Sequence, residues 1–440
     1  MKRYISIFVL ALLGFTAQAS ASTLGDIDGN GQVNVSDVTA LVNKILGVAS
    51  YDDARCDVNA DGQVNVSDVT TLVNIILGTY EDPNQRFAGA DISLLERYEE
   101  RGALYYDKSG SRVTDMLAFY KQIGLNAMRV RLFVDPSKAP AADKGTGVFQ
   151  DLAYVGTLGK RIKEHGLKFI LDFHYSDSWA DPGKQTVPAR WKGLTPAVMA
   201  DSVYRYTKES LQALVAAGAK PDMVQVGNEI TYGMLWDSGS VWPEGTANKG
   251  TWENFSAYFN AGARAVREVL PAAKIICHIE MANNSNPAKF FGVGAKNFSL
   301  DYDIMGLSYY PAYHAKAATI ISALEGVVKQ LKVQVPDRPI MIMETGYSYR
   351  WEMSGTKDAT ISSKYAYTEA GQAKFTTDLI AMLKKYEQVK GLFWWCAEQN
   401  EYGLDWNTQR VVDNWWQASL VDNQNGHILQ ATYELPTFIK

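Results

Sequence analysis

Short apolar runs alternate with amphipathic segments through most of the 440-residue chain. Segments such as "DMLAFYKQIGL" and "SLQALVAAGA" place their apolar residues at helical spacing. The apolar runs have the length and composition of buried strands. They lie at residues 87–92, 127–134, 168–174, 223–228, 275–279, 303–308, 339–343 and 391–396. Eight strands joined by helical crossovers predict an α/β fold, a closed (β/α)8 TIM barrel. An open doubly wound sheet is the alternative, although no glycine-rich nucleotide motif follows the first strand.

A duplicated pattern of polar and apolar residues precedes these strands. Residues 25–47 read "GDIDGNGQVNVSDVTALVNKILG" and residues 56–78 read "CDVNADGQVNVSDVTTLVNIILG", an offset of 31 residues. In each copy, side-chain oxygens fall at positions 1, 3, 5, 9 and 12 of a twelve-residue loop, with glycine at position 6 and a backbone carbonyl available at position 7. This spacing is typical of a calcium loop, whereas a polar turn without metal is the alternative. The expected structural calcium ligands are Asp26, Asp28, Asn30, Gln32, Asn34 and Asp37, and Asp57, Asn59, Asp61, Gln63, Asn65 and Asp68.

The duplicated loop–helix unit resembles a type I dockerin over residues 25–78. We therefore predict a small all-α calcium-binding domain at residues 22–80, followed by a linker at residues 81–86. The resemblance implies a cohesin-type partner, recognised in part through loop positions 10 and 11, which are Val-Ser in both copies. Docking onto the chain's own larger domain and capping of its N-terminus are the alternatives.

The first 21 residues differ in pattern from the rest of the chain. Lys2 and Arg3 precede an apolar run at residues 5–17, and the small residues of "AQASAS" follow it. This order is typical of a secretory signal peptide, and the run is too short to span a bilayer comfortably. We predict a signal peptide at residues 1–21 with cleavage after Ala19 or Ala21. The mature protein would be secreted, periplasmic or held at the cell surface.

Charge and cysteine content exclude several other classes of protein. The net charge is −5, and no basic stripe is present, which argues against a nucleic-acid partner. No segment of the mature chain is long and apolar enough for a transmembrane helix. Cys56, Cys277 and Cys396 cannot all pair, and the last two lie inside apolar runs. We therefore expect buried free thiols rather than a disulfide framework.

Two carboxylates stand at the ends of predicted buried strands. Glu229 in "VQVGNEI" and Glu344 in "IMIMETGYS" close the fourth and seventh apolar runs. A charge there is costly unless the site uses it, and the active sites of barrels lie at the carboxyl ends of the strands. A buried structural carboxylate is the alternative for either residue alone. Together, the two indicate the paired carboxylates of glycoside hydrolysis.

Other polar and aromatic residues collect at the same strand ends. Arg129 and Arg131 are placed after the second strand, "LDFHYSDSWADPGKQ" after the third, His278 after the fifth and Trp394-Trp395 after the eighth. All 11 tryptophans lie beyond residue 150, most of them in these loops. Aromatic rings stack on the faces of sugars, so this clustering favours a sugar cleft over loop packing alone.

Residues 87–440 resemble glycoside hydrolase family 53, the endo-β-1,4-galactanases. The motif "DFHYSDSWADPGKQ" carries the resemblance, together with "VGNEITYGMLW", "GLSYYPAYH" and "ETGYSY". The resemblance implies an endo-acting hydrolase of β-1,4-galactosidic bonds in the (arabino)galactan side chains of pectin, with no cofactor for catalysis. The chain departs from the family at the fifth-strand stretch "CHIEMANNS" and, at the eighth strand, at Cys396-Ala397, where the family often has Glu-Pro. Those loops shape the distal cleft, so the departures bear on the number of sugar subsites.

The resemblance also implies roles for individual residues. Glu229 would be the acid/base and Glu344 the nucleophile of a retaining mechanism, with their carboxyls about 5–5.5 Å apart. A raised pKa would keep Glu229 protonated, whereas a nearby arginine and a hydrogen bond from Tyr310 would favour ionised Glu344. The expected substrate-binding residues are Asn228 (at the sugar 2-hydroxyl), Arg129, Arg131, His174, Asp177, Trp179, His278, Tyr310 and Trp395.

Two other functions are compatible with parts of this pattern. A related barrel enzyme would cut mannan, xylan or glucan, and the motif after the third strand argues against it. A protein without activity would bind polysaccharide or serve as a calcium-dependent scaffold. The presence of both carboxylates with Asn228 and Tyr310 argues against that second alternative.

Overall fold

The computed structural model describes residues 23–59, 61–77, 82, 84–241, 250–280 and 286–440. It divides into two compact units, residues 1–85 and residues 86–440. The predicted signal peptide and part of the predicted linker lie outside the described residues. Within the described ranges, no helix combines the length and apolar character that a membrane crossing requires.

In its described residues, the N-terminal unit contains the helices α1 (Val35–Ile45), α2 (Asp53–Cys56) and α3 (Val66–Ile76). Helices α1 and α3 each begin with a capping box, in which an asparagine N-cap and an aspartate three residues later satisfy exposed backbone N–H groups. Their apolar faces meet in a small core around Ile27, Leu41 and Leu72. The all-α interpretation of the repeat is confirmed.

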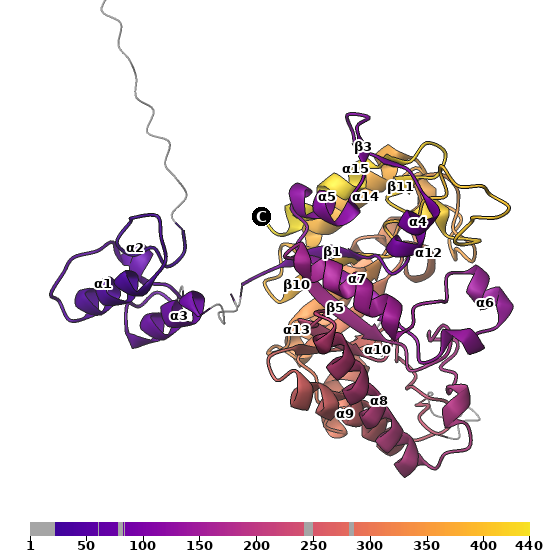
Figure 1. Cartoon of the computed structure of the whole chain (residues 1–440), viewed down its shortest axis with the longest axis horizontal. Helices are drawn as coiled ribbons and strands as arrows, with labels where there is room; N and C mark the ends of the chain where they lie inside the picture. The colour runs from indigo at the N-terminus through magenta and orange to yellow at the C-terminus, as the bar shows by residue number, and fades with distance from the viewer. Residues whose placement is uncertain (1–22, 60, 78–81, 83, 242–249, 281–285) are drawn as a thin grey trace, which may run out of the picture. The chain divides into compact units, whose positions relative to one another are not determined.

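Eight parallel strands of the second unit close into a barrel (Figure 1). Its strands are β1 (Phe87–Asp91), β4 (Ala127–Leu132), β5 (Lys168–Phe173), β6 (Met223–Val226), β7 (Lys274–Ile279), β8 (Ile304–Tyr309), β9 (Ile340–Thr345) and β10 (Val389–Trp394). Neighbours follow the chain order, and β1 pairs with both β4 and β10. Each apolar run predicted to be a strand overlaps one of them. The predicted TIM barrel is therefore confirmed, and the alternative prediction of an open doubly wound sheet is wrong.

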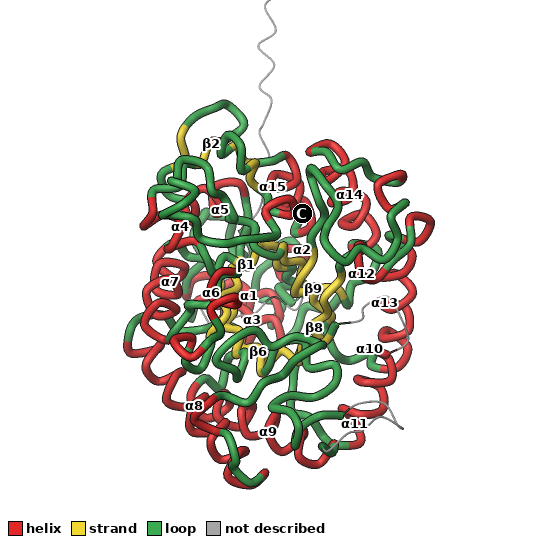
Figure 2. The backbone as a smooth tube through the Cα atoms, turned by 90° about the vertical axis from the view of Figure 1, so that its right-hand side faces the viewer, coloured by secondary structure: helices red, strands yellow, loops and turns green. Residues whose placement is uncertain are grey.

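Helices surround the barrel, as the alternating pattern predicts (Figure 2). They are α4 (Leu95–Arg101), α5 (Met116–Ile123), α6 (Ala141–Gly145), α7 (Leu152–Glu164), α8 (Pro196–Ala216), α9 (Trp252–Val269), α10 (Asn286–Lys289), α11 (Ala295–Asn297), α12 (Pro311–His314), α13 (Ser322–Gln334), α14 (Glu369–Leu383) and α15 (Gln430–Glu434). Four two-residue strands form a separate small sheet: β2 (Tyr105–Tyr106), β3 (Arg112–Val113), β11 (Val421–Asp422) and β12 (His427–Ile428).

The inside of the barrel changes character along its axis. Apolar side chains, among them Ile170, Ile276 and Phe393, form one buried cluster inside it. Gly89 has no space for a side chain, because a Cβ there would lie 1.7 Å from the Ala127 carbonyl oxygen. Nearer the carboxyl ends, the strand register pairs Asp91 with Arg129. The barrel interior is therefore apolar at the level of this cluster and charged nearer the carboxyl ends of the strands.

Cys56, Cys277 and Cys396 are all buried free thiols, as expected from the apolar runs that hold two of them.

Candidate active site

A cleft of about 600 Å³ opens at the carboxyl ends of the barrel strands. Both Glu229 and Glu344 line it, the first just after β6 and the second near the end of β9. Aromatic rings from several loops line the same cleft, and they are Trp179, Tyr310, Tyr313, Trp395 and Trp415. The volume is within the range of small-ligand sites, and this lining of carboxylates and aromatic rings suits a sugar.

A tight turn places Glu229 in the cleft. Strand β6 ends at Val226, and Gly227 then adopts a φ of +87°. Glu229 itself has a φ of +48°, in the left-handed region that a residue with a Cβ rarely occupies. Such a backbone costs on the order of 1–3 kcal/mol and persists where the surroundings enforce it. The turn directs the carboxyl of Glu229 into the cleft rather than along the strand.

The two carboxyls have different electrostatic surroundings. Burial raises the pKa of Glu229 well above its ordinary value, and the negative charge of Glu344 raises it further. Burial also raises the pKa of Glu344, but the nearby Arg129 guanidinium opposes this rise, and the net pKa is about 7. The Tyr310 hydroxyl donates a hydrogen bond to Glu344 Oε2 at 2.9 Å and also favours the ionised form. Glu229 therefore favours the protonated form more strongly, whereas Glu344 is the carboxyl that is more easily ionised.

Arg129 connects Glu344 to a buried polar network. It lies within β4, not after it as the sequence suggested, and its side chain is fully buried. Its guanidinium lies 3.0 Å from Glu344 Oε1. It also donates four hydrogen bonds, to Asp91 Oδ2, Asp172 Oδ2, Gln225 Oε1 and Asn228 Oδ1, at 2.7–3.2 Å. Of the two candidate arginines, Arg129 is therefore the one that contacts the nucleophile candidate.

Asn228 is held at the floor of the cleft by its neighbours. Its Oδ1 accepts hydrogen bonds from Arg129 and from Gln225, and its Nδ2 donates to the Ala180 carbonyl at 2.8 Å. His278 Nδ1 lies 3.1 Å from the same Oδ1, and Nε2 lies 2.8 Å from Ser308 Oγ. Burial and the Arg129 charge lower the pKa of His278 well below its ordinary value. A neutral His278 therefore orients Asn228 from beneath, and does not line the cleft.

The remaining predicted sugar-binding residues divide into two groups. Trp179 and Trp395 line the cleft, with ring centroids 6.1 Å apart. His174 and Arg131 are buried below them; the Arg131 guanidinium lies 4.7 Å from the Trp179 ring centroid, over its face. Asp177 accepts a hydrogen bond from a loop N–H at residue 189. His174, Arg131 and Asp177 therefore position the loops and rings, and none of the three lines the cleft.

Sequence reasoning missed three members of the buried network. Asp91 bridges Arg129 and Arg131, with one oxygen on each guanidinium. Asp172 contacts Arg129 and lies 3.1 Å from His174 Nε2, and Gln225 donates to Asp172 at 2.5 Å. Charged and amide residues inside apolar strand runs are the signal that would have identified all three.

The first repeat in the N-terminal unit gathers oxygen atoms suited to calcium. Carboxylate oxygens of Asp26, Asp28 and Asp37 lie within 4.8 Å of one another. Asp26 Oδ1 is buried and, among the described residues, has no hydrogen-bond partner. Asn34 Oδ1 caps α1 by accepting a hydrogen bond from the Ser36 N–H. This suits position 9 of a calcium loop, whose residue often contacts the ion through a water molecule. The donor set therefore fits a hard cation.

The second repeat shares the helix capping and the backbone hydrogen bonds of the first, but among the described residues its carboxylates are not gathered as closely. Asp57 accepts hydrogen bonds from backbone N–H groups of the loop, and Asp68 accepts from Asn59 and Asn65. Asn65 caps α3 in the same way as Asn34 caps α1. Calcium, when bound, would neutralise the carboxylates gathered in the first loop and hold that loop against α1.

Family models match both units. Residues 87–435 match glycosyl hydrolase family 53, and residues 24–77 match the dockerin type I domain. The two matches cover the barrel and the repeat, respectively.

Individual proteins give the same result. An uncharacterized protein of Niallia circulans is 31% identical over 342 residues, covering 76% of this chain and 89% of that protein. An endo-β-1,4-galactanase of Bacillus subtilis strain 168 is 30% identical over 375 residues, covering 78% of this chain and 83% of that protein. The solved catalytic domain of a family 53 protein from Ignisphaera aggregans is 30% identical with a TM-score of 0.70, covering 81% of this chain and 97% of that domain.

Proposed function

Because the chain belongs to glycosyl hydrolase family 53, we propose that it is an endo-β-1,4-galactanase acting on the galactan side chains of pectin. The observation that carries this proposal is the pair of carboxyls in one aromatic cleft, with Glu344 paired to Arg129 and Glu229 unpaired by any cation among the described residues. The galactanase of Bacillus subtilis, similar over most of both chains, supports the choice of galactan.

The first chemical step follows from the two protonation states. Ionised Glu344 attacks the anomeric carbon of the sugar and forms a covalent ester. As the glycosidic C–O bond breaks, Glu229 gives its proton to the leaving oxygen, so that the departing chain leaves as an alcohol. Arg129 and Tyr310 hold the Glu344 carboxylate in place for the attack.

The second step returns both carboxyls to their starting forms. Glu229, now ionised, takes a proton from a water molecule, whose oxygen attacks the anomeric carbon. The ester bond to Glu344 breaks and releases the carboxylate. Asn228 Nδ2 uses one of its two N–H groups on Ala180, which leaves the other for the sugar 2-hydroxyl. Two inversions give net retention of the anomeric configuration.

Substitution of the proposed nucleophile tests the reaction. Glu344→Ala should release reducing ends from debranched β-1,4-galactan at least about 10³-fold more slowly than wild type. Glu325→Ala, which changes a carboxylate on α13 outside the cleft lining, is the matched control. Wild-type release from mannan, xylan or glucan but not from galactan would assign a different substrate, and no release from any of them would contradict hydrolysis.

Proton NMR of the first product tests the stereochemistry. A retaining enzyme gives the β-anomer first, before mutarotation. An initial α-anomer would contradict the covalent step through Glu344.

The N-terminal unit is proposed to tether the enzyme. A dockerin domain implies a cohesin-type partner on another protein, and such an assembly fits a secreted or surface-held enzyme. N-terminal sequencing of the exported protein tests the predicted cleavage, and an intact Met1 would contradict it. Pull-down of the full chain with cohesin domains, with and without calcium, tests the partner.

A further inference from the structure

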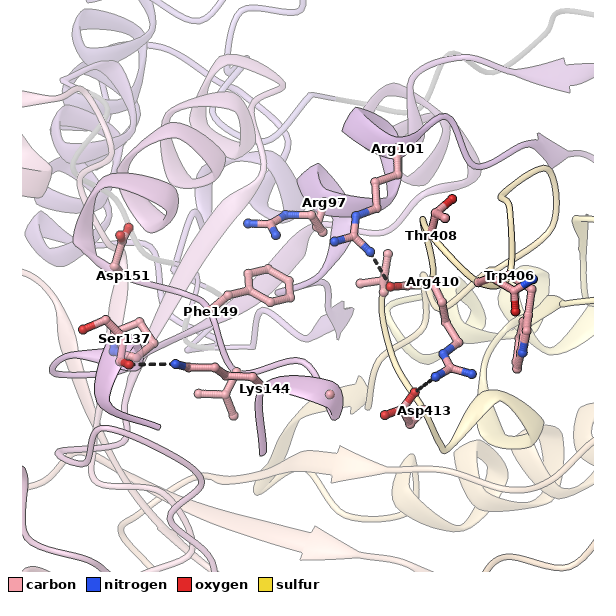
Figure 3. A pocket seen from close by; sticks show the side chains of 15 residues that line it. Arg97, Arg101, Ser137, Lys144, Phe149, Asp151, Trp406, Thr408, Arg410 and Asp413 are labelled. Atoms are coloured by element: carbon pink, nitrogen blue, oxygen red, sulfur yellow. Dashed lines mark hydrogen bonds and ion pairs between the residues drawn. The ribbon is translucent and has the colours of Figure 1, made fainter. Parts of the chain in front are cut away.

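The barrel unit has a second cavity, of about 570 Å³, whose lining residues are drawn in Figure 3. Its wall comes from α4, from the segment between β4 and α7, and from the loop that follows β10. Arg97 and Arg101 extend into it from α4, and Trp406 and Arg410 lie on the β10 side. None of these residues takes part in the chemistry described above.

The cavity carries an excess of positive charge. Arg97, Arg101, Lys144 and Arg410 line it, against the two carboxylates of Asp151 and Asp413. Asp413 is paired with Arg410 at 2.6 Å, and Asp151 caps α7 by accepting from the Tyr154 N–H. The lining is therefore cationic, although the whole chain has a net charge of −5. A local field of this sign favours an anionic ligand.

Several of these cations have donors to spare. The Arg97 guanidinium stacks 4.4 Å from the Phe149 ring centroid and is fixed by it. Its Nε lies 3.4 Å from Glu100, and in the described part of the chain its two terminal nitrogens donate no hydrogen bond. Arg101 uses one terminal nitrogen on the carbonyls of Gln409 and Arg410. A guanidinium held in this way presents the planar pair of donors that a carboxylate accepts.

An aromatic ring stands next to these donors. Trp406 is 48% exposed, and the Arg410 guanidinium lies 4.7 Å from its ring centroid. The ring also packs against Trp416, with centroids 5.1 Å apart, and its remaining exposed surface can contact the C–H surface of a sugar ring, which a simple inorganic anion lacks. The cavity therefore combines arginine donors that can bind a ligand carboxylate with an aromatic ring that can contact a sugar.

The cavity and the cleft share a wall. The Asp413 N–H donates to the Gly145 carbonyl at 2.9 Å, and this bond joins the segment after β4 to the loop after β10. Gly145 and Asp413 line the cationic cavity, whereas their chain neighbours Thr146 and Asn414 line the catalytic cleft. The cationic cavity and the catalytic cleft are therefore neighbours on either side of these two segments.

We propose that this cavity binds a hexuronate residue of the polysaccharide whose neutral galactan enters the catalytic cleft. The uronate carboxylate pairs with Arg97 and Arg101, and its ring contacts the exposed surface of Trp406. The proposal rests on the proposed galactanase function for the identity of the polymer. Its consequence is that the enzyme recognises galactan still attached to an acidic backbone, and not only free neutral chains.

Binding of an acidic oligosaccharide tests the cavity without any catalysis. Isothermal titration of trigalacturonate into the wild-type full chain should show saturable binding that weakens with added salt. Arg97→Gln should weaken it by about tenfold or more, since one charge-assisted contact contributes about 1.5–3 kcal/mol. Trp406→Ala should weaken it too. Arg205→Gln, an exposed arginine on α8, is the control and should bind as wild type does.

The outcomes separate the alternatives. Absence of binding, or equal binding by wild type and Arg97→Gln, would overturn the proposal. Binding that sulfate displaces and that Trp406→Ala leaves unchanged would also overturn it, because that site would take any anion. Loss in both variants, with folding intact by circular dichroism, would support it.

Kinetics separate this inference from the proposed function. On galactan attached to a uronate backbone, Arg97→Gln should raise KM several-fold, while kcat/KM on neutral debranched galactan stays unchanged. Trigalacturonate binding without galactan hydrolysis would remove the galactanase assignment and leave the uronate site intact. Galactan hydrolysis with no effect of Arg97→Gln on either polymer would remove the uronate site and leave the galactanase assignment intact.

Discussion

Replacement of Tyr310 by phenylalanine tests the assigned protonation states directly. The Tyr310 hydroxyl donates to Glu344 Oε2 at 2.9 Å and opposes the effect of burial, which, with this bond in place, leaves the pKa of Glu344 raised to about 7. The hydrogen bond stabilises the ionised form of Glu344. A bond of this kind to a charged group contributes about 1.5–3 kcal/mol. Its loss in Tyr310→Phe should therefore raise the pKa of Glu344 and leave the shape of the cleft unchanged.

The sign of the effect on activity follows from the role of Glu344. Attack requires the carboxylate, so kcat/KM rises as the pH increases through the Glu344 pKa. A higher pKa moves this acidic limb to higher pH, and the rate below the limb should fall by roughly 10- to 100-fold. On the plateau the loss should be smaller, because Glu344 is ionised in both enzymes. The two limbs belong to the coupled pair of carboxyls, and the basic limb, governed by Glu229, should move little.

Initial rates of reducing-end release on galactan, measured across the acidic and neutral range, supply the profile. Tyr313→Phe is the matched control, because Tyr313 lines the same cleft but donates its hydroxyl to the Ser354 carbonyl. An acidic limb that stays in place in Tyr310→Phe, or that moves equally in both variants, would refute the assignment of Glu344 as the ionised partner.

Three further predictions concern stability. Burial raises the pKa of Glu398 to about 8 from its ordinary 4.5, so the folded state holds this proton and the free energy of unfolding falls as pH rises between these two values. Glu398→Gln, which keeps the hydrogen bond from the Leu94 N–H, should lose that part of the pH dependence in urea unfolding. Arg129→Met should lower the free energy of unfolding by about 3–5 kcal/mol, because it leaves buried carboxylates unpaired, and a smaller loss in urea titration would count against the network. Calcium chelation should lower the melting temperature of the N-terminal unit and leave the barrel's unchanged in calorimetry, whereas an unshifted first transition would argue against calcium binding.

The barrel was largely predictable because each strand is a local apolar run. The eight predicted runs differ from the observed strands by at most two residues at either end. Closure followed from the count of strands and crossovers. The small sheet was not predictable, because each of its strands has two residues and β12 pairs with β2 from the opposite end of the chain. No local pattern reports a pairing of that kind.

The position of the two carboxylates in one cleft was predictable, but the depth of the other candidate residues was not. Strand ends and motifs predicted that Glu229 and Glu344 share a cleft, and the family resemblance predicted the hydrogen bond from Tyr310 to Glu344. The sequence did not distinguish residues that line the cleft from residues that support it, because both kinds are polar and adjacent to strands. His278 and Arg131 were expected to contact sugar, yet both are fully buried below the cleft. Depth along the barrel axis depends on register, which arises from the packing of all eight strands together.

Arg129 also has a consequence for how this sequence can change over time. Its guanidinium joins β1, β4, β5, β6 and β9 through Asp91, Asp172, Gln225 and Glu344. Lysine has three donors and no planar fork, so even the mildest replacement leaves some of these partners unsatisfied. A change at any partner likewise strands a donor of Arg129. A single substitution at any of these five positions is therefore expected to be deleterious, whichever position changes first. The five residues are expected to change only together.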